Sequence, residues 1–129
     1  GFSREEGISV VRKGKSGAEE IIAMMKAFRS NPPKSLGGSK VVTIKDYADL
    51  NVTDVTTGTV SKMDMPTTSN VLQYFTEDGT KVSIRPSGTE PKIKFYIEVK
   101  GTMATNADYD KAISEADNKI AAVKTDLGI

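Results

Sequence analysis

The segment from Lys92 to Lys100 alternates strictly between apolar and polar side chains, and this alternation constrains the fold more than any other feature of the sequence. Successive side chains of a β-strand point to opposite sides of the sheet. The apolar side is Ile93, Phe95, Ile97 and Val99, and the polar side includes Lys94, Tyr96 and Glu98. Such a strand predicts a sheet that buries one face in a core and leaves the other face for solvent or a ligand.

Four further ranges are rich in the β-branched and aromatic residues that favour strands. They are Glu6 to Lys13, Lys40 to Ile44, Val71 to Phe75, and Lys81 to Arg85. Glu77-Asp78-Gly79 separates the last two ranges and predicts an antiparallel hairpin, because glycine accepts a positive φ. The stretch from Asp46 to Met65 is polar and lacks a clear period, so it is interpreted as a surface excursion with a short strand near 59–62.

Helical spacing of apolar residues predicts two helices. The first runs from about Gly17 to Arg29, with Ser16 and Glu19 as a capping box, and Asn31-Pro32-Pro33 ends it. Its apolar face is Ala18, Ile21, Ile22, Met25 and Phe28. The second begins near 105–108 and ends at Gly128. Its stripe is Tyr109, Ala112, Ile113, Ala116, Ile120, Val123 and Leu127.

These elements together indicate an α+β fold, with a small, mostly antiparallel sheet flanked by two helices. A chain of 129 residues lies within the usual size of one domain, so residues 1–129 are expected to share one core. Residues 1–15 are expected to be a lead-in from a preceding domain.

Composition limits the functions that the chain can perform. The 18 Lys and Arg residues nearly cancel the 17 Asp and Glu residues, which argues against nucleic acid or a membrane as a partner. No apolar run is long enough to span a bilayer and no signal peptide is evident, so a cytoplasmic protein is expected. The chain has no Cys and no His, which excludes Ser-His-Asp and Cys-His catalysis and the common zinc sites within it.

The loop between the last two predicted strands carries the groups that an anion site needs. Arg85 offers a planar fork for two phosphate oxygens, and Ser87 and Thr89 offer hydroxyl groups. With Gly88 they also offer successive backbone N–H groups, which can form an anion-binding nest if Gly88 takes a positive φ. Lys94 lies on the polar side of the following strand, from where its ammonium group can approach the same anion.

Two other interpretations of this loop remain open on the residues alone. Ser87-Gly88-Thr89 can be a simple turn with its neighbouring charges solvated, and the strand-loop-strand surface can belong to a noncatalytic module that binds an anion, a protein or RNA. Glu90 fits a phosphate site only if it orients Arg85 or Lys94 or meets a sugar hydroxyl, because a carboxylate repels phosphate.

The segment from Arg85 to Tyr96 resembles the phosphate-binding loop in the C-terminal domain of the α-D-phosphohexomutases, especially the bacterial phosphoglucomutase/phosphomannomutase type. Its sequence is Arg85-Pro86-Ser87-Gly88-Thr89-Glu90-Pro91-Lys92-Ile93-Lys94-Phe95-Tyr96. The region from Gly14 to Glu20, the helix after it and Asn31-Pro32-Pro33 also resemble the part of these enzymes that leads into the motif.

The resemblance implies a fold like that of the TATA-binding protein and a role for each matching residue. It assigns Arg85, Ser87, Gly88 and Thr89 to the substrate phosphate that is not transferred. Lys94 is expected to assist through its positive charge, and Glu90 belongs to the motif as an accessory residue without an assigned role. It implies no catalytic residue and no metal ligand in this chain. The family's phosphoserine loop, its magnesium motif and its sugar-reading motif are all absent from the sequence.

The nearest match to the magnesium motif is Asp108-Tyr109-Asp110, which is interpreted as acidic residues favouring the start of a helix. The resemblance therefore implies that this chain binds no cofactor itself and that magnesium is held by upstream domains of a full-length enzyme. The expected activity of that enzyme is the interconversion of hexose 1-phosphate and hexose 6-phosphate through a bisphosphate intermediate. The expected partners are a glucose or mannose phosphate and the upstream domains.

Overall fold

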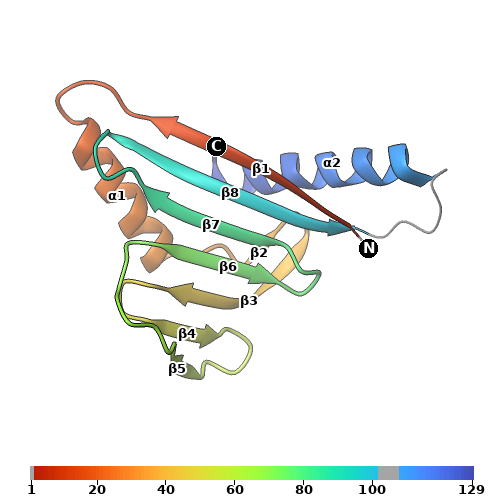
Figure 1. The fold of residues 1–129 in the computed structure, drawn as a ribbon, viewed down its shortest axis with the longest axis horizontal. Helices are drawn as coiled ribbons and strands as arrows, with labels where there is room; N and C mark the ends of the chain where they lie inside the picture. The colour runs from red at the N-terminus through yellow and green to blue at the C-terminus, as the bar shows by residue number, and fades with distance from the viewer. Residues whose placement is uncertain (1, 102–107) are drawn as a thin grey trace.

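A computed structural model describes residues 2–101 and 108–129 and shows an α+β fold, as the sequence predicts. Its antiparallel sheet follows the order β1-β8-β7-β6-β3-β4-β5, while the short β2 pairs with β3 beside this path (Figure 1). The strands are β1 (Phe2–Val11), β2 (Ser35–Leu36), β3 (Ser39–Asp46), β4 (Asn51–Asp54), β5 (Val60–Lys62), β6 (Leu72–Thr76), β7 (Lys81–Pro86) and β8 (Lys92–Gly101). The helices are α1 (Gly17–Ser30) and α2 (Tyr109–Leu127).

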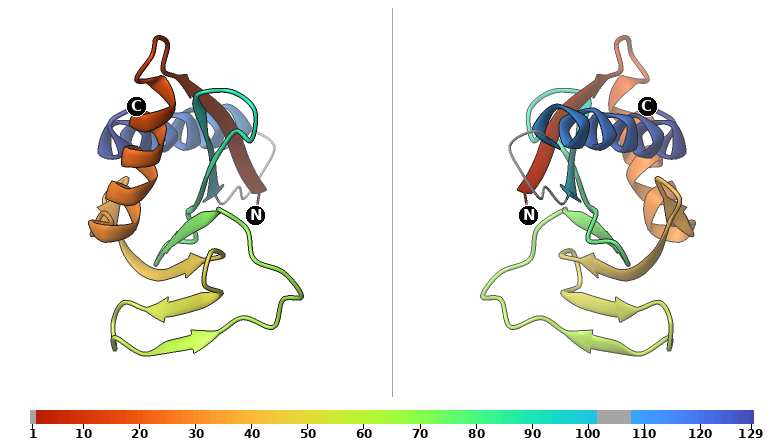
Figure 2. Two further views of the ribbon diagram at one scale, coloured as in Figure 1. Left: turned by 90° about the vertical axis from the view of Figure 1, so that its left-hand side faces the viewer. Right: turned by 90° about the vertical axis from the view of Figure 1, so that its right-hand side faces the viewer.

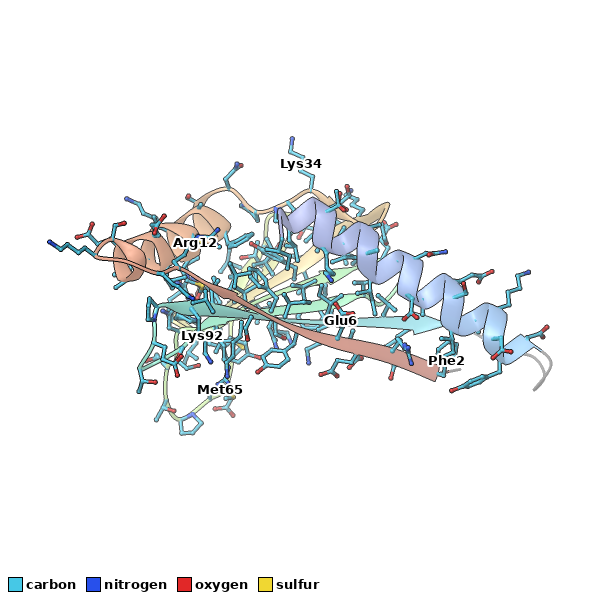
Figure 3. The ribbon with its side chains drawn as sticks, turned by 90° about the horizontal axis from the view of Figure 1, so that it is seen from above. Phe2, Glu6, Arg12, Lys34, Met65 and Lys92 are labelled. Atoms are coloured by element: carbon cyan, nitrogen blue, oxygen red, sulfur yellow. The ribbon has the colours of Figure 1, made fainter. Side chains whose placement is uncertain are left out.

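Both helices cover the same face of the sheet and leave the other face open (Figure 2). Figure 3 shows this from above, with Met65, in the segment between β5 and β6, on the side away from the helices. The apolar side of β8 faces the helices, since Ile93, Phe95 and Ile97 are fully buried and the Phe28 ring of α1 meets Phe95 edge to face at 5.6 Å. The alternation in the sequence therefore identified the core face correctly.

The hairpin between β6 and β7 forms as predicted. Leu72 pairs with Ile84 and Phe75 pairs with Lys81, and Gly79 in the turn has a φ of 87°. Val82 and Ile84 alternate into the core, so Lys81, Ser83 and Arg85 lie on the face without helices. The hairpin thus fixes the face on which Arg85 lies.

The first strand is longer than the sequence indicated. β1 begins at Phe2 and pairs antiparallel with β8 along its whole length, from Phe2 opposite Gly101 to Val11 opposite Lys92. Its burial alternates only from Ile8 onward, because the earlier part is charged and lies at the edge of the sheet. Charged side chains on an edge strand hinder pairing with other chains. This role explains why the first half of β1 lacks the apolar alternation of a typical strand.

The polar stretch from Asp46 to Met65 contains more regular structure than expected. The short strand near 59–62 is present as β5, but β4 was not predicted, and it pairs with both β3 and β5. Asp54 accepts hydrogen bonds from the backbone N–H groups of Thr56 and Thr57, and this turn joins the two strands. β4 has four residues with no buried side chain, so its sequence carries no apolar alternation that would indicate a strand.

Details of the helices also differ from the predictions. Ser16 makes no side-chain capping bond at α1, and Ala18 and Ile22 are exposed although they were placed on the apolar face. In α2 the buried residues of the predicted stripe are Ala112, Ala116, Ile120, Val123 and Leu127, whereas Tyr109 is exposed. Gly128 ends this helix in the left-handed conformation. The predicted start at 105–107 lies outside the described residues. Neither helix in the described part of the chain is long and apolar enough to cross a membrane.

Candidate phosphate site

Arg85 and Lys94 lie directly opposite each other on β7 and β8, near the end of the sheet from which the loop extends. Both side chains are on the face without helices, and Arg85 is exposed. Among residues 2–101 and 108–129, no acidic side chain forms an ion pair with either one. Like charges directly opposite in a ladder are destabilising, so this pair is a favourable place for an anion.

The loop that follows does not form the predicted nest of three free N–H groups. The Ser87 N–H group donates to the carbonyl oxygen of Lys92 at 2.9 Å, which closes the hairpin. The backbone N–H groups of Thr89 and Glu90 both donate to the Ser87 hydroxyl oxygen at 3.4 Å, so this hydroxyl turns into the loop. The prediction of free Ser87 and Thr89 amides was therefore wrong, because the hairpin closure uses the first donor and the Ser87 hydroxyl accepts from the second.

Gly88 differs from the prediction in a second respect. Its φ is not positive, and a Cβ built on it would meet nothing within 4 Å. The loop curves without the left-handed conformation, so glycine is not needed here for backbone geometry. What glycine contributes instead is an open approach to the main chain at the exposed tip of the loop.

A hollow of about 430 Å³ separates the loop from the start of α1. The loop wall runs from Pro86 to Pro91, and the opposite wall includes Gly14, Lys15, Ala18 and Ile22. Ser87, Gly88 and Thr89 thus line this hollow, whereas Arg85 and Lys94 do not. The structure divides the predicted residues between two adjoining surfaces, the hollow and the sheet face without helices.

Residues on the far wall of the hollow were not among the predicted site residues. Lys15 is exposed and brings a cation to the side facing the loop. The sequence contained one signal for it, since Gly14 to Glu20 belongs to the region that resembles the phosphohexomutases. Only the tertiary structure shows that this region, far from the loop in sequence, lies across from it.

Glu90 forms an ion pair with Lys92 at 3.8 Å, and its side chain remains mostly exposed. A pair this exposed contributes little to stability. It does reduce the negative charge that Glu90 presents to an anion on the loop. The cation that Glu90 meets is Lys92, and not Arg85 or Lys94 as considered from the sequence.

The described residues do not fit a magnesium site. In residues 2–101 and 108–129, no three carboxylate, imidazole or thiolate groups gather closely enough to hold a metal ion. Magnesium requires an octahedral shell of oxygen ligands, usually with more than one carboxylate near it. No step of the chemistry below is therefore assigned to a metal ion on this part of the chain.

The fold and the loop define a domain that presents cations and loop donors at one end of an antiparallel sheet. A family model described as "Phosphoglucomutase/phosphomannomutase, C-terminal domain" matches residues 12–116. The chain therefore belongs to the phosphoglucomutase/phosphomannomutase C-terminal domain family, as the resemblance at Arg85 to Tyr96 predicted.

Curated relatives agree with this assignment. A phosphoglucomutase of Staphylococcus aureus (strain MRSA252) is 42% identical over 88 residues, which is 68% of this chain and 16% of the relative. A phosphoglucomutase of Staphylococcus saprophyticus subsp. saprophyticus is 35% identical over 100 residues, covering 78% of this chain and 18% of the relative. The chain thus spans less than a fifth of the length of these relatives.

Proposed function

We propose that this domain binds the phosphate group of a hexose phosphate and holds it while other domains of a longer phosphohexomutase carry out the transfer. The observation that supports the proposal most directly is the cross-strand pair of Arg85 and Lys94, which has no acidic partner among the described residues. A phosphate dianion beside this pair would replace a repulsive contact with two attractive ones.

The roles follow from the chemistry of each group. The Arg85 guanidinium donates two parallel hydrogen bonds to phosphate oxygens, and the Lys94 ammonium adds a second positive charge. At the exposed tip of the loop, Gly88 supplies a backbone N–H group and Thr89 supplies a hydroxyl. Ser87 shapes the loop through its amide and hydroxyl and can turn its hydroxyl outward when a ligand binds.

Such a site contributes to catalysis by positioning. A phosphate held at one end of the sugar orients the other end toward a nucleophile, which lowers the entropic part of the barrier. We place that nucleophile, the magnesium ion and the residues that select glucose or mannose on other domains. The relatives are long enough to carry such domains, since this chain matches only 16% of the Staphylococcus aureus enzyme. The reaction proposed for the whole protein is the isomerisation of hexose 1- and 6-phosphates through a bisphosphate.

An NMR titration of the 129-residue chain tests the binding role. Glucose 1-phosphate and inorganic phosphate should both shift the amide signals of Gly88, Thr89 and Glu90, with a Kd on the order of mM, because one domain supplies only part of the contacts. Arg85→Ala should raise this Kd about tenfold, and Lys94→Ala should raise it less. Lys34→Ala, at an exposed position between α1 and β2, is the matched control that removes one positive charge elsewhere.

Two outcomes would contradict the proposal. If Arg85→Ala leaves the phosphate-induced shifts unchanged, phosphate binds elsewhere or only through general electrostatics. If a short RNA shifts the same amides more strongly than either phosphate ligand does, the surface belongs to a noncatalytic nucleic-acid module instead. Glucose serves as the negative ligand control, because it lacks the phosphate group.

A further inference from the structure

Tyr96 lies midway along β8, on the sheet face that carries Arg85 and Lys94. It lies on β8, directly opposite Gly7 of β1 on one side and Ser83 of β7 on the other. A Cβ built on Gly7 would lie 3.5 Å from both Cδ1 and Cε1 of the Tyr96 ring. The ring therefore rests on the bare backbone of Gly7 and is half-buried on an otherwise solvent-facing surface.

The Arg85 guanidinium lies over this ring. Its Cζ atom is 6.0 Å from the ring centroid, at the outer limit of a cation–π interaction. Arg85 and Tyr96 are diagonal neighbours across the β7–β8 ladder, since Arg85 pairs with Lys94, and such diagonals are within reach of long and aromatic side chains. In the described part of the chain, no carboxylate pairs with Arg85 to orient it from another direction.

An aromatic ring orients an arginine in a way that suits ligand binding. The ring contacts the face of the guanidinium plane, whereas the five N–H donors point outward along its edges. A carboxylate partner would occupy those donors, and a solvated arginine would lose rotamer freedom when it bound an anion. A ring beside the guanidinium restricts the arginine rotamers before a ligand binds and leaves the N–H donors free for the anion.

We propose that Tyr96 is a positioning residue that holds the Arg85 guanidinium in its phosphate-binding orientation. The inference rests on the proposed function, because it assigns Tyr96 a role only if Arg85 binds phosphate. Tyr96 acts through Arg85 and needs no contact with the ligand. Its ring is the required part, and its hydroxyl is not.

The test compares phosphate affinity in four variants of the chain, measured by NMR titration with inorganic phosphate. Tyr96→Phe keeps the ring and should bind as the unmodified chain does. Tyr96→Leu and Tyr96→Ile remove the ring and should raise Kd about two- to fivefold, which corresponds to the loss of an exposed cation–π contact. Gly7→Ala places its Cβ at an ordinary contact distance from the ring and should leave Kd unchanged.

Two further measurements separate positioning from a general structural effect. The Arg85 Nε–H group should become more mobile in NMR relaxation when the ring is removed, and not in Tyr96→Phe. In an Arg85→Ala background, Tyr96→Leu should change Kd no further, because the residue through which it acts is gone.

The outcomes distinguish the two proposals. Equal affinities of the Leu, Ile and unmodified chains, or a Tyr96→Leu effect of the same size with and without Arg85, would overturn the positioning role and leave the proposed function intact. Phosphate binding by the unmodified chain that does not depend on Arg85 would overturn the proposed function. Having both the Leu and Ile variants keeps the comparison available if one of them does not fold.

Discussion

A Cβ atom on Gly17 would lie 2.3 Å from the backbone carbonyl oxygen of Arg12, closer than any non-bonded contact allows. Gly17 is the first residue of α1, and Arg12 follows the end of β1. The Arg12 N–H group donates to the carbonyl oxygen of Pro91 at 2.9 Å. The backbone of Arg12 therefore contacts both the start of α1 and the candidate phosphate loop.

Gly17→Ala should therefore destabilise the fold by about 1–3 kcal/mol, because the backbone must move to accommodate the new methyl group. The movement should reach the loop through Arg12 and Pro91 and weaken phosphate binding as well. Urea unfolding gives the first quantity, and the phosphate titration gives the second. An unchanged unfolding midpoint would show that this contact is looser than the structure indicates.

Gly88→Ala is the matched comparison, since it adds the same methyl group within the loop itself. A Cβ at Gly88 meets nothing within 4 Å and the φ is not positive, so the free energy of unfolding should change by no more than about 0.5 kcal/mol. Phosphate affinity should nevertheless fall, because the methyl group would occupy the approach to the main chain. A variant that binds phosphate normally would place the ligand away from the tip of the loop.

Tyr74→Phe should cost about 1–2 kcal/mol of stability. The buried Tyr74 hydroxyl donates to the carbonyl oxygen of Phe28 at 2.6 Å. This carbonyl lies in the last turn of α1, where carbonyl groups lack partners within the helix. The variant leaves a buried acceptor without its donor. Tyr109→Phe, at an exposed position, should leave stability unchanged. Urea unfolding near pH 7 measures both.

The same tyrosine should affect stability at alkaline pH. Burial raises the pKa of Tyr74 above its ordinary value, so the folded state holds this proton more tightly than the unfolded state. The contribution of this protonated hydroxyl to the unfolding free energy is complete below the unfolded pKa of about 10, and it decreases as the pH rises above that value. Unfolding free energies between pH 9 and 11 should fall less steeply in Tyr74→Phe. Identical slopes would show that the Tyr74 proton is not linked to unfolding.

Ile22 and Met25 lie on the same predicted apolar face of α1 but have different environments. Ile22 is 69% exposed and Met25 is 3% exposed. Met25→Ala should therefore cost about 2–5 kcal/mol, while Ile22→Ala should change stability by about 0.5 kcal/mol or less. Chemical denaturation of the two variants checks this contrast. If both variants lose a similar unfolding free energy, the Ile22 side chain is buried in solution and the exposure seen in the structure is wrong.

Much of the fold could be predicted because strand and helix periods are local properties of the sequence. The alternation in β8 identified its buried face, and the Glu77-Asp78-Gly79 turn identified the hairpin. β4 could not be predicted, because a strand with both faces partly exposed has no apolar alternation. The exposure of Ile22 could not be predicted either, since helical spacing shows which residues share a face but not how far the sheet extends beneath it.

For the candidate site, the sequence alone determined that Arg85 and Lys94 fall on the polar side of neighbouring strands and that a glycine-containing loop connects those strands. The tertiary structure decided that the two cations face each other, that the Ser87 amide closes the hairpin, and that α1 forms the opposite wall of the hollow. It also decided that Tyr96 rests on Gly7 and meets Arg85. Side-chain direction along a strand follows from local geometry, whereas strand register and the approach of distant segments depend on packing of the whole core.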